Sequence, residues 1–261
     1  MKRYIMIGAP VTKVRTPPLL KAFLFGLGTD ADIEARPVDT NDLDAFMKAV
    51  QDDASIDGLL VTMPHKRAVI PYLEAISTVA RQAGSVNSVK RLASGALVGG
   101  QFDGAALVNA LRAKGARVDE ARILLAGVGG AGLAIAQAIA THGCQGLMIA
   151  DLNSERRDAT VAALNGQSRC TVSARRGAGQ DTFDLLINAT PLGMRDGDPS
   201  PFEPELVSQA SWIADIVADP PATHLAALAR AARITLITGR DMVDGQVKLI
   251  GRWLLSQDVE Q

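Results

Sequence analysis

The chain has 261 residues, a formal net charge of -1 and 48% hydrophobic residues, so it is long enough for two domains that each bury a core. The balanced charge, without a stripe of Lys and Arg, argues against a nucleic-acid partner and favours a small-molecule partner. The two cysteines have neither a disulfide nor a metal-binding spacing, and no apolar run fits a signal peptide or a membrane span, so we expect a cytoplasmic protein with no membrane partner and no metal, either a monomer or a homodimer.

Short apolar runs alternate with helical patterns over the first hundred residues. The sequence predicts strands at residues 4–7, 33–38 and 58–61, and helices at residues 17–27 and 43–50. This repeated order of strand and helix predicts a mostly parallel sheet with crossover helices.

A second series of strands and helices begins near residue 121. A strand at residues 122–126 precedes a Gly-rich turn, and a helix over 133–141 and a strand at 147–150 follow it. Later strands are predicted at residues 185–188, 212–215 and 235–237. The final segment has apolar residues on one helical face, so it should pack on a domain; these residues are Val247, Ile250, Trp253 and Leu254.

The Gly-rich turn Gly127-Val128-Gly129-Gly130-Ala131-Gly132 predicts a dinucleotide site, because an apolar strand precedes it and a helix of small residues follows it. Gly127 permits the tight turn, and Gly129 lets the backbone approach a pyrophosphate held by the N–H groups of the helix N-terminus. Gly132 allows close packing of the helix on the sheet. The plainer alternative is an ordinary Gly-rich turn.

An acidic residue, Asp151, ends the next predicted strand. Its carboxylate is suited to accept hydrogen bonds from both ribose hydroxyls and would repel a 2′-phosphate. Leu152 beside it offers no guanidinium to compensate, so the sequence predicts NAD in preference to NADP. Arg156, one helical turn further on, leaves open a contact with the adenine or with a phosphate.

Seven ordered segments resemble the shikimate/quinate dehydrogenase family over nearly the whole chain. They are Gly8-Ala9-Pro10 with Thr16-Pro17, residues 61–66, residues 84–89, Asp103-Gly104, residues 188–194, residues 215–223, and residues 239–242 with Gln246. The resemblance implies an α/β fold in which residues 1–102, completed by residues 241–261 through a returning C-terminal helix, bind the substrate. It also implies that residues 103–240 form a Rossmann-type NAD-binding domain.

The resemblance implies a hydride exchanged between a secondary alcohol of a shikimate-like cyclic hydroxy acid and the nicotinamide. Lys66 and Asp103 would be the catalytic pair. The implied substrate contacts are Thr16, Thr62, Asn87 and Gln246. The implied cofactor contacts are Gly127, Val128, Gly129, Gly130, Ala131, Asp151, Asn153, Arg156, Asn188, Ala189, Thr190, Pro191, Val217, Gly239 and Met242.

Lys66 and Asp103 suit proton transfer to and from a hydroxyl group. Burial favours the neutral amine of a lysine whereas a neighbouring aspartate favours the ammonium, so the two form one coupled pair. Which of them is formally the base stays open. A solvated surface lysine and an ordinary Asp-Gly turn are the plainer alternatives.

Four departures from the family pattern lie on the substrate side. Val14 replaces the first of two serines that hold the substrate carboxylate in the family, while Thr16 keeps the second hydroxyl; Lys13 or Arg15 could supply a cation instead. The other departures are Leu60, Gln101-Phe102 and Ala218.

These departures predict an altered substrate pocket, so shikimate, quinate, an amino-substituted analogue and other ring acids stay open. The alternatives to this enzyme are an NAD-binding sensor that has the fold but no turnover, and an α/β dehydrogenase acting on folates.

Overall fold

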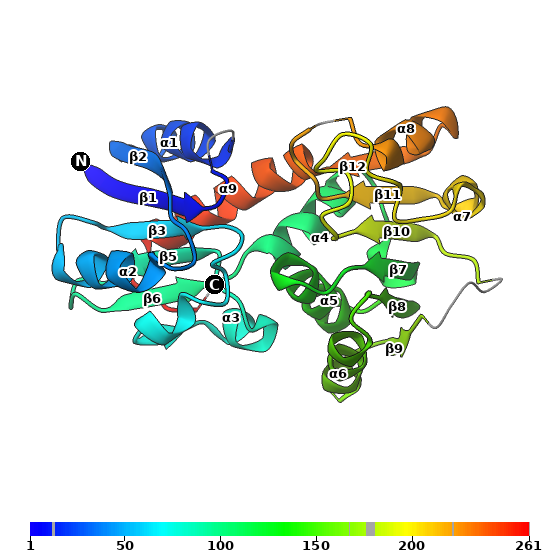
Figure 1. Ribbon diagram of the computed structural model, residues 1–261, viewed down its shortest axis with the longest axis horizontal. Helices are drawn as coiled ribbons and strands as arrows, with labels where there is room; N and C mark the ends of the chain where they lie inside the picture. Colours follow the sequence, from blue (N-terminus) through cyan, green and yellow to red (C-terminus); the bar gives the residue numbers. More distant parts are fainter. Residues whose placement is uncertain (12–13, 167, 176–180, 221, 261) are drawn as a thin grey trace. The chain divides into compact units, whose positions relative to one another are not determined.

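The computed structural model describes residues 1–11, 14–166, 168–175, 181–220 and 222–260. It divides into two compact units, one made of residues 1–103 and 246–261 and the other of residues 104–245. Both are α/β units with mostly parallel sheets, which confirms the predicted fold class (Figure 1).

The sheet of the first unit has the strand order β2-β1-β3-β5-β6-β4. β1 pairs in parallel with β2 and β3, whereas β5 runs antiparallel to both β3 and β6. The strands are β1 (Lys2–Gly8), β2 (Ala31–Pro37), β3 (Gly58–Val61), β4 (Ala75–Ile76), β5 (Ser88–Arg91) and β6 (Leu97–Gly100). The reversal at β5 brings the residue before it, Asn87, to the edge where β3 ends.

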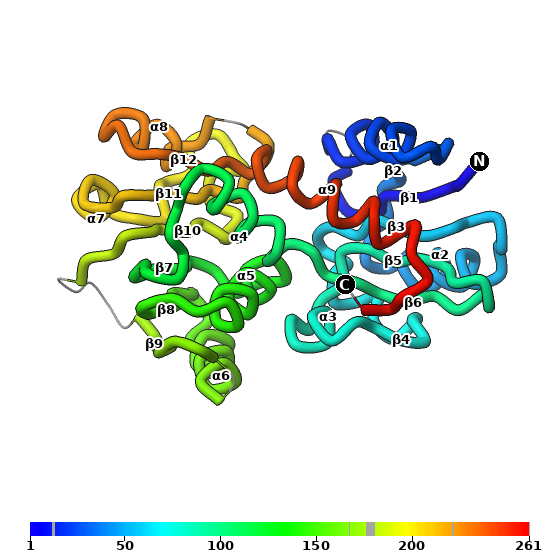
Figure 2. Tube along the Cα trace, turned by 180° about the vertical axis from the view of Figure 1, so that it is seen from behind, coloured from blue at the N-terminus to red at the C-terminus, as the bar shows by residue number. Residues whose placement is uncertain are grey.

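Helices cover both faces of this sheet. The helices are α1 (Thr16–Gly26), α2 (Leu43–Asp52), α3 (Thr78–Ala83), the 3₁₀ turn η1 (Ile70–Tyr72) and the end of α9 (Gly239–Leu255). Met47 of α2 and Ala80 of α3 belong to the same buried cluster as Val89 of β5. Side chains alternate along a strand, so the next residue, Lys90, faces the other side, which the last turns of α9 cover (Figure 2).

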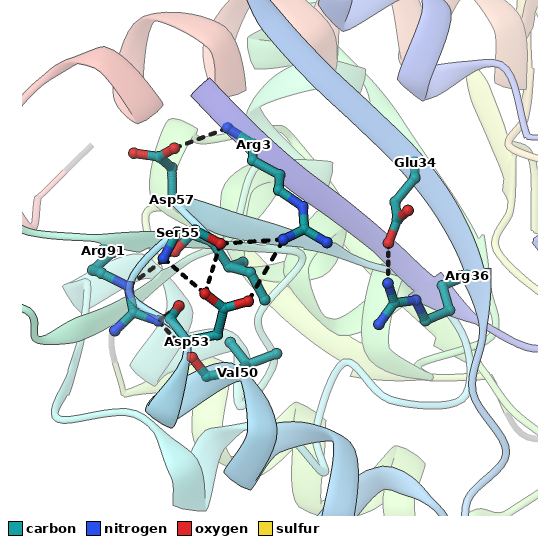
Figure 3. Close-up of polar contacts among 9 residues, drawn as sticks. Arg3, Glu34, Arg36, Val50, Asp53, Ser55, Asp57 and Arg91 are labelled. Atoms are coloured by element: carbon teal, nitrogen blue, oxygen red, sulfur yellow. Dashed lines mark hydrogen bonds and ion pairs between the residues drawn. The ribbon is translucent and has the colours of Figure 1, made fainter. Parts of the chain in front are cut away.

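The edge of this sheet where β1 and β3 begin is closed by polar contacts, shown in Figure 3. The backbone N–H of Arg3 donates to Asp57 at 2.8 Å, and the Arg3 guanidinium donates to Ser55. Arg91 donates to the carbonyl oxygens of Ile56 and Val50 at 2.9 and 2.6 Å. These bonds satisfy backbone groups at the edge where β1 and β3 begin.

The sheet of the second unit is parallel throughout, with the strand order β12-β11-β10-β7-β8-β9. This is the doubly wound order of dinucleotide-binding folds, and the order reverses between β7 and β10. The strands are β7 (Arg122–Ala126), β8 (Gly146–Ala150), β9 (Thr171–Ala174), β10 (Leu185–Asn188), β11 (Trp212–Asp215) and β12 (Thr235–Thr238). Ligands bind such sheets at the carboxyl ends of the strands beside the reversal.

Side-chain caps mark the start of two helices of the second unit. The helices of this unit are α4 (Asp103–Ala113), η2 (Val118–Glu120), α5 (Gly130–His142), α6 (Ser154–Asn165), α7 (Pro204–Gln209), α8 (His224–Ala231) and the first turns of α9. Asn153 and Thr223 cap α6 and α8 by accepting from backbone N–H groups three residues on. The helix predicted over residues 133–141 begins three residues earlier, inside the Gly-rich turn.

Gly104 marks a close approach of two helices in the second unit. A Cβ at this position would lie 2.3 Å from the carbonyl oxygen of Ala134 and 2.6 Å from the Cβ of Ala138, both in α5. α4 begins at Asp103, so Asp103 and Gly104 form the first residues of a helix and not the turn that an Asp-Gly pair also suggests.

We expect Gly104→Ala to lower the free energy of unfolding by about 1–3 kcal/mol, because the added methyl overpacks the contact between α4 and α5. Gly26→Ala is the matched control, since a Cβ there meets nothing within 4 Å. Urea denaturation would measure both variants. A stable Gly104→Ala variant would contradict the close approach.

Candidate active site

Backbone hydrogen bonds hold the segment that carries Lys66. Beyond the end of β3, the Thr62 N–H donates to the carbonyl oxygen of Ile7 at 2.9 Å. The buried His65 ring places Nε2 at 2.6 Å from the carbonyl oxygen of Val38. The carbonyl oxygen of Lys66 itself accepts from the N–H of Val86 at 2.7 Å. Lys66 therefore stands at the carboxyl edge of the sheet, where its strand position predicts it.

The carboxylate of Asp103 is the centre of a cluster in the first unit. Lys66 Nζ donates to Oδ2 at 2.7 Å. Asn87 Nδ2 and Gln246 Nε2 both donate to Oδ1, at 3.0 and 2.6 Å. The Asp103 side chain is 2% exposed and that of Lys66 is 13% exposed, so Lys66 is the more accessible member of the pair.

Two amide side chains fix the backbone that leads into Asp103. Asn87 Oδ1 accepts from the N–H of Phe102 at 3.1 Å, and Gln101 Oε1 accepts from the N–H of Asp103 at 2.8 Å. Gln101 Nε2 in turn donates to Ser85 Oγ at 2.8 Å. From the sequence, Gln101 was expected on the substrate side only as a departure from the family pattern, and no role was predicted for Ser85; an amide two residues before a helix start was the available signal for the contact with Asp103.

The structure brings together four of the six residues predicted for catalysis and substrate binding, namely Lys66, Asp103, Asn87 and Gln246. The two amides bond to Asp103, and their contacts with a substrate stay predictions. Thr16 lies buried at the first residue of α1, and Thr62 lies against Gly8, where a Cβ would meet its methyl group at 2.3 Å.

Val14, the departure at the position of the family's first serine, lies just after residues 12–13, which the structure does not describe. The side chain of Val14 is half-buried and that of Arg15 is exposed, while Lys13 lies outside the described residues.

The Gly-rich turn has the backbone geometry that a dinucleotide requires. Gly127 has a φ of +89°, and a Cβ there would lie 2.8 Å from the carbonyl oxygen of Ala189. A Cβ at Gly132 would lie 2.0 Å from the carbonyl oxygen of Gly127, so the start of α5 packs on the turn itself. At Gly129, by contrast, a Cβ would meet nothing within 4 Å. The turn is thus tight on its protein side and open at Gly129, and the contact of Gly129 with a pyrophosphate stays a prediction.

Asp151 lies beside this turn. Its Oδ2 accepts from the N–H of Val128 at 2.8 Å, and its Oδ1 accepts from the N–H of Asn153 and from Arg156 Nη2 at 2.8 and 2.7 Å. Burial acts to raise the pKa of Asp151, but the bonds from Arg156, Val128 and Asn153 outweigh it and hold the pKa below its ordinary value. The carboxylate is ionised at neutral pH, and the exposed Leu152 supplies no charge.

The end of β10 is held by a buried polar network. Asn188 Nδ2 donates to Asp215 and to the carbonyl oxygen of Leu192, both at 3.0 Å, while its Oδ1 accepts from Thr190. Asp215, whose pKa burial raises, also accepts from the N–H of Val217 at 3.2 Å. The side chain of Asn188 therefore shapes the segment that carries Ala189, Thr190 and Pro191.

Two further predicted cofactor residues lie at the start of α9. A Cβ at Gly239 would lie 2.5 Å from the carbonyl oxygen of Ile216, so only glycine fits there, and Met242 is buried. Within the described part of the chain, no three His, Cys, Asp or Glu side chains gather where they could hold a metal ion. Nor does any described helix combine the length and apolarity that a membrane crossing requires.

Known proteins share both the motifs and the fold. The family described as shikimate dehydrogenase substrate binding domain matches residues 6–89. The shikimate dehydrogenase (NADP(+)) of Moorella thermoacetica is 32% identical, over 91% of this chain and 82% of that protein. The quinate/shikimate dehydrogenase (NAD(+)) of Corynebacterium glutamicum is 31% identical, over 91% and 87%. The structure of a 5-ketofructose reductase from Gluconobacter sp. has a TM-score of 0.84 and 25% identity, over 97% and 92%.

With the doubly wound unit, its open glycine turn and these relatives, the chain falls in the class of NAD(P)-dependent dehydrogenases. Within that class it belongs to the shikimate/quinate dehydrogenase family. The resemblance drawn from the sequence motifs is thereby confirmed.

We expect Asp103→Asn to lower the free energy of unfolding by about 3 kcal/mol, because the change leaves the Lys66 ammonium without its buried counter-charge. Urea denaturation would measure the loss. Asp44→Asn is the control, since Asp44 pairs with Lys48 on an exposed face of α2 and should matter far less. Equal losses in the two variants would show that the Asp103 cluster does not form.

Proposed function

We propose that this protein transfers a hydride between NAD and a secondary alcohol or ketone of a shikimate-like cyclic hydroxy acid. The observation that carries the proposal is the Lys66–Asp103 pair with its two amides, at the carboxyl edge of a sheet. The named activities of the Moorella and Corynebacterium relatives support the substrate class.

Lys66 is the group that moves the proton. In the direction of ketone reduction, its ammonium polarises the carbonyl and donates a proton to the oxygen as a hydride reaches the carbon. In the direction of oxidation, the neutral amine accepts the hydroxyl proton. The bound nicotinamide supplies or takes up the hydride.

Asp103 acts as the fixed counter-charge. Its two oxygens accept three hydrogen bonds and its side chain is 2% exposed, so it orients the Lys66 ammonium. This arrangement supports Lys66, instead of Asp103, as the proton-transferring partner of the substrate.

NAD is the proposed cofactor. The buried, ionised carboxylate of Asp151 repels a 2′-phosphate, and Leu152 does not neutralise it. Arg156, 45% exposed, bonds to one oxygen of that carboxylate and has to turn away for both ribose hydroxyls to be bound. One of the two relatives is named for NADP and the other for NAD, so membership of the family does not decide between the two cofactors.

A carboxylate-free polyol is the second candidate substrate. Val14 places an apolar side chain where the family has the first serine for the carboxylate, and a 5-ketofructose reductase shares the fold. A neutral substrate would not need the lost contact.

Turnover assays would decide between these substrates. We expect NAD-dependent oxidation of shikimate or quinate, and Lys66→Met should lower kcat by at least about 100-fold with little change in NADH affinity, because the variant lacks the proton donor. Lys48→Met, at an exposed lysine, is the control. Turnover with 5-ketofructose and NADH, but with neither ring acid, would establish the second candidate. Tight NAD binding without turnover on any of the three would favour the sensor that the sequence left open.

Cofactor choice gives a separate prediction. We expect kcat/KM to be at least about tenfold higher with NAD than with NADP, and Asp151→Ala to reduce that ratio, because the repelling charge is lost. Arg156→Ala should keep the preference, since Asp151 remains. Steady-state kinetics with both cofactors would measure the ratios, and equal efficiency of the wild type with NAD and NADP would refute the assignment.

A further inference from the structure

A buried lysine that the proposed chemistry does not use lies in the middle of the first unit. Lys90 of β5 is 1% exposed. Its Nζ donates to the carbonyl oxygens of Trp253, Ser256 and Asp258 at 2.8, 3.0 and 2.6 Å, and to Ser256 Oγ at 2.9 Å. The ammonium also lies 4.2 Å from the centroid of the Trp253 ring. Every polar contact of this amine is therefore with the last turn of α9 or the residues just after it.

The contacts of Lys90 compensate a helix end. The last carbonyl groups of a helix have no partner within it, and the helix dipole places partial negative charge there. Desolvation lowers the pKa of Lys90 to about 8, with the charge of Asp258 acting the other way, so the amine is still an ammonium at neutral pH. Burial of this cation carries a desolvation cost, and its hydrogen bonds to the end of α9 act against that cost.

The helix that Lys90 holds carries a member of the active site. Gln246, seven residues before Trp253 in α9, donates to Asp103 at 2.6 Å. Seven residues of helix span about 10 Å. A shift of α9 along its axis would therefore move the Gln246 amide relative to Asp103. The Trp253 ring also meets Phe102, the residue before Asp103, edge to face with 5.4 Å between centroids. Lys90 itself follows Asn87, the other amide on Asp103, by three residues in the chain.

We propose that Lys90 is a positioning residue: by anchoring the C-terminal end of α9, it aims the Gln246 amide at Asp103 and so sets the orientation of the Lys66 ammonium. Packing of α9 on α1, where a Cβ at Gly251 would lie 2.5 Å from the Phe23 ring, fixes the helix sideways. Hydrophobic contacts of that kind tolerate sliding along the axis better than directed hydrogen bonds do. The Lys90 ammonium supplies the directed bonds.

A double-mutant cycle tests this inference, which rests on the proposed function for its kinetic readout. Lys90→Met keeps the length of the side chain and removes its charge and donors. We expect it to lower kcat by about ten- to a hundredfold, with a smaller change in KM, because the catalytic groups are displaced. In a Gln246→Leu background, Lys90→Met should lower kcat by less than about twofold, since Lys90 acts through Gln246. Equal fold losses in both backgrounds would overturn the proposal.

Hydrogen exchange provides a readout that does not need turnover. Lys90→Met should speed amide exchange over residues 246–256 while residues 43–52 of α2 keep their protection. Lys48→Met, on α2, is the matched control and should change neither segment. Unchanged exchange in α9 would overturn the proposal whatever the kinetics show. If Lys90→Met does not fold, Ser256→Ala removes only one acceptor of the ammonium, and a kcat loss in the same direction, abolished by Gln246→Leu, is expected.

If the wild-type protein turns over none of the substrates, the proposed function is contradicted, but the anchoring of α9 by Lys90 is not. The anchoring of α9 would then stand or fall on the exchange measurement alone.

Discussion

The first unit is organised by the need to compensate one buried carboxylate. A charge as enclosed as that of Asp103 is tolerated only if its oxygens are fully hydrogen-bonded and a cation is close. Three separate segments meet this demand: the loop after β3 brings Lys66, the segment before β5 brings Asn87, and α9 brings Gln246. The same contacts that stabilise the carboxylate leave the lysine as the reactive group at its edge.

In the second unit the main constraint is the close packing of backbone around the Gly-rich turn, not the compensation of a buried charge. Gly127 and Gly132 are packed so closely by the turn and by Ala189 that no side chain fits, whereas Gly129 is open. Asp151 presents an ionised carboxylate that is bonded to that turn. Fold and cofactor chemistry are coupled because the tight glycines place the N-terminus of α5 next to this carboxylate.

How much the sequence predicts differs between the units. Apolar strands, turn glycines and the acidic residue at Asp151 have fixed spacings, so five of the six strands of the second unit were predicted, all but β9, and the fold class is confirmed. The antiparallel β5 and β6 could not be, because Lys90 within β5 looks like a surface residue and Gly99-Gly100 gives β6 a turn-like composition. The contact of Gln101 with Asp103 was not predicted, although the two residues are only two positions apart, because the helix that starts at Asp103 was not among the predicted helices.

The chain connectivity of the first unit imposes an order on folding. Domains generally fold as units, starting from the N-terminal side during synthesis, but this unit is interrupted by the whole of residues 104–245. Lys90 and Asp103 emerge from the ribosome long before the helix that satisfies them. The unit that is begun first is thus completed last, and until α9 is made its interior holds an ammonium and a carboxylate that lack part of their partners.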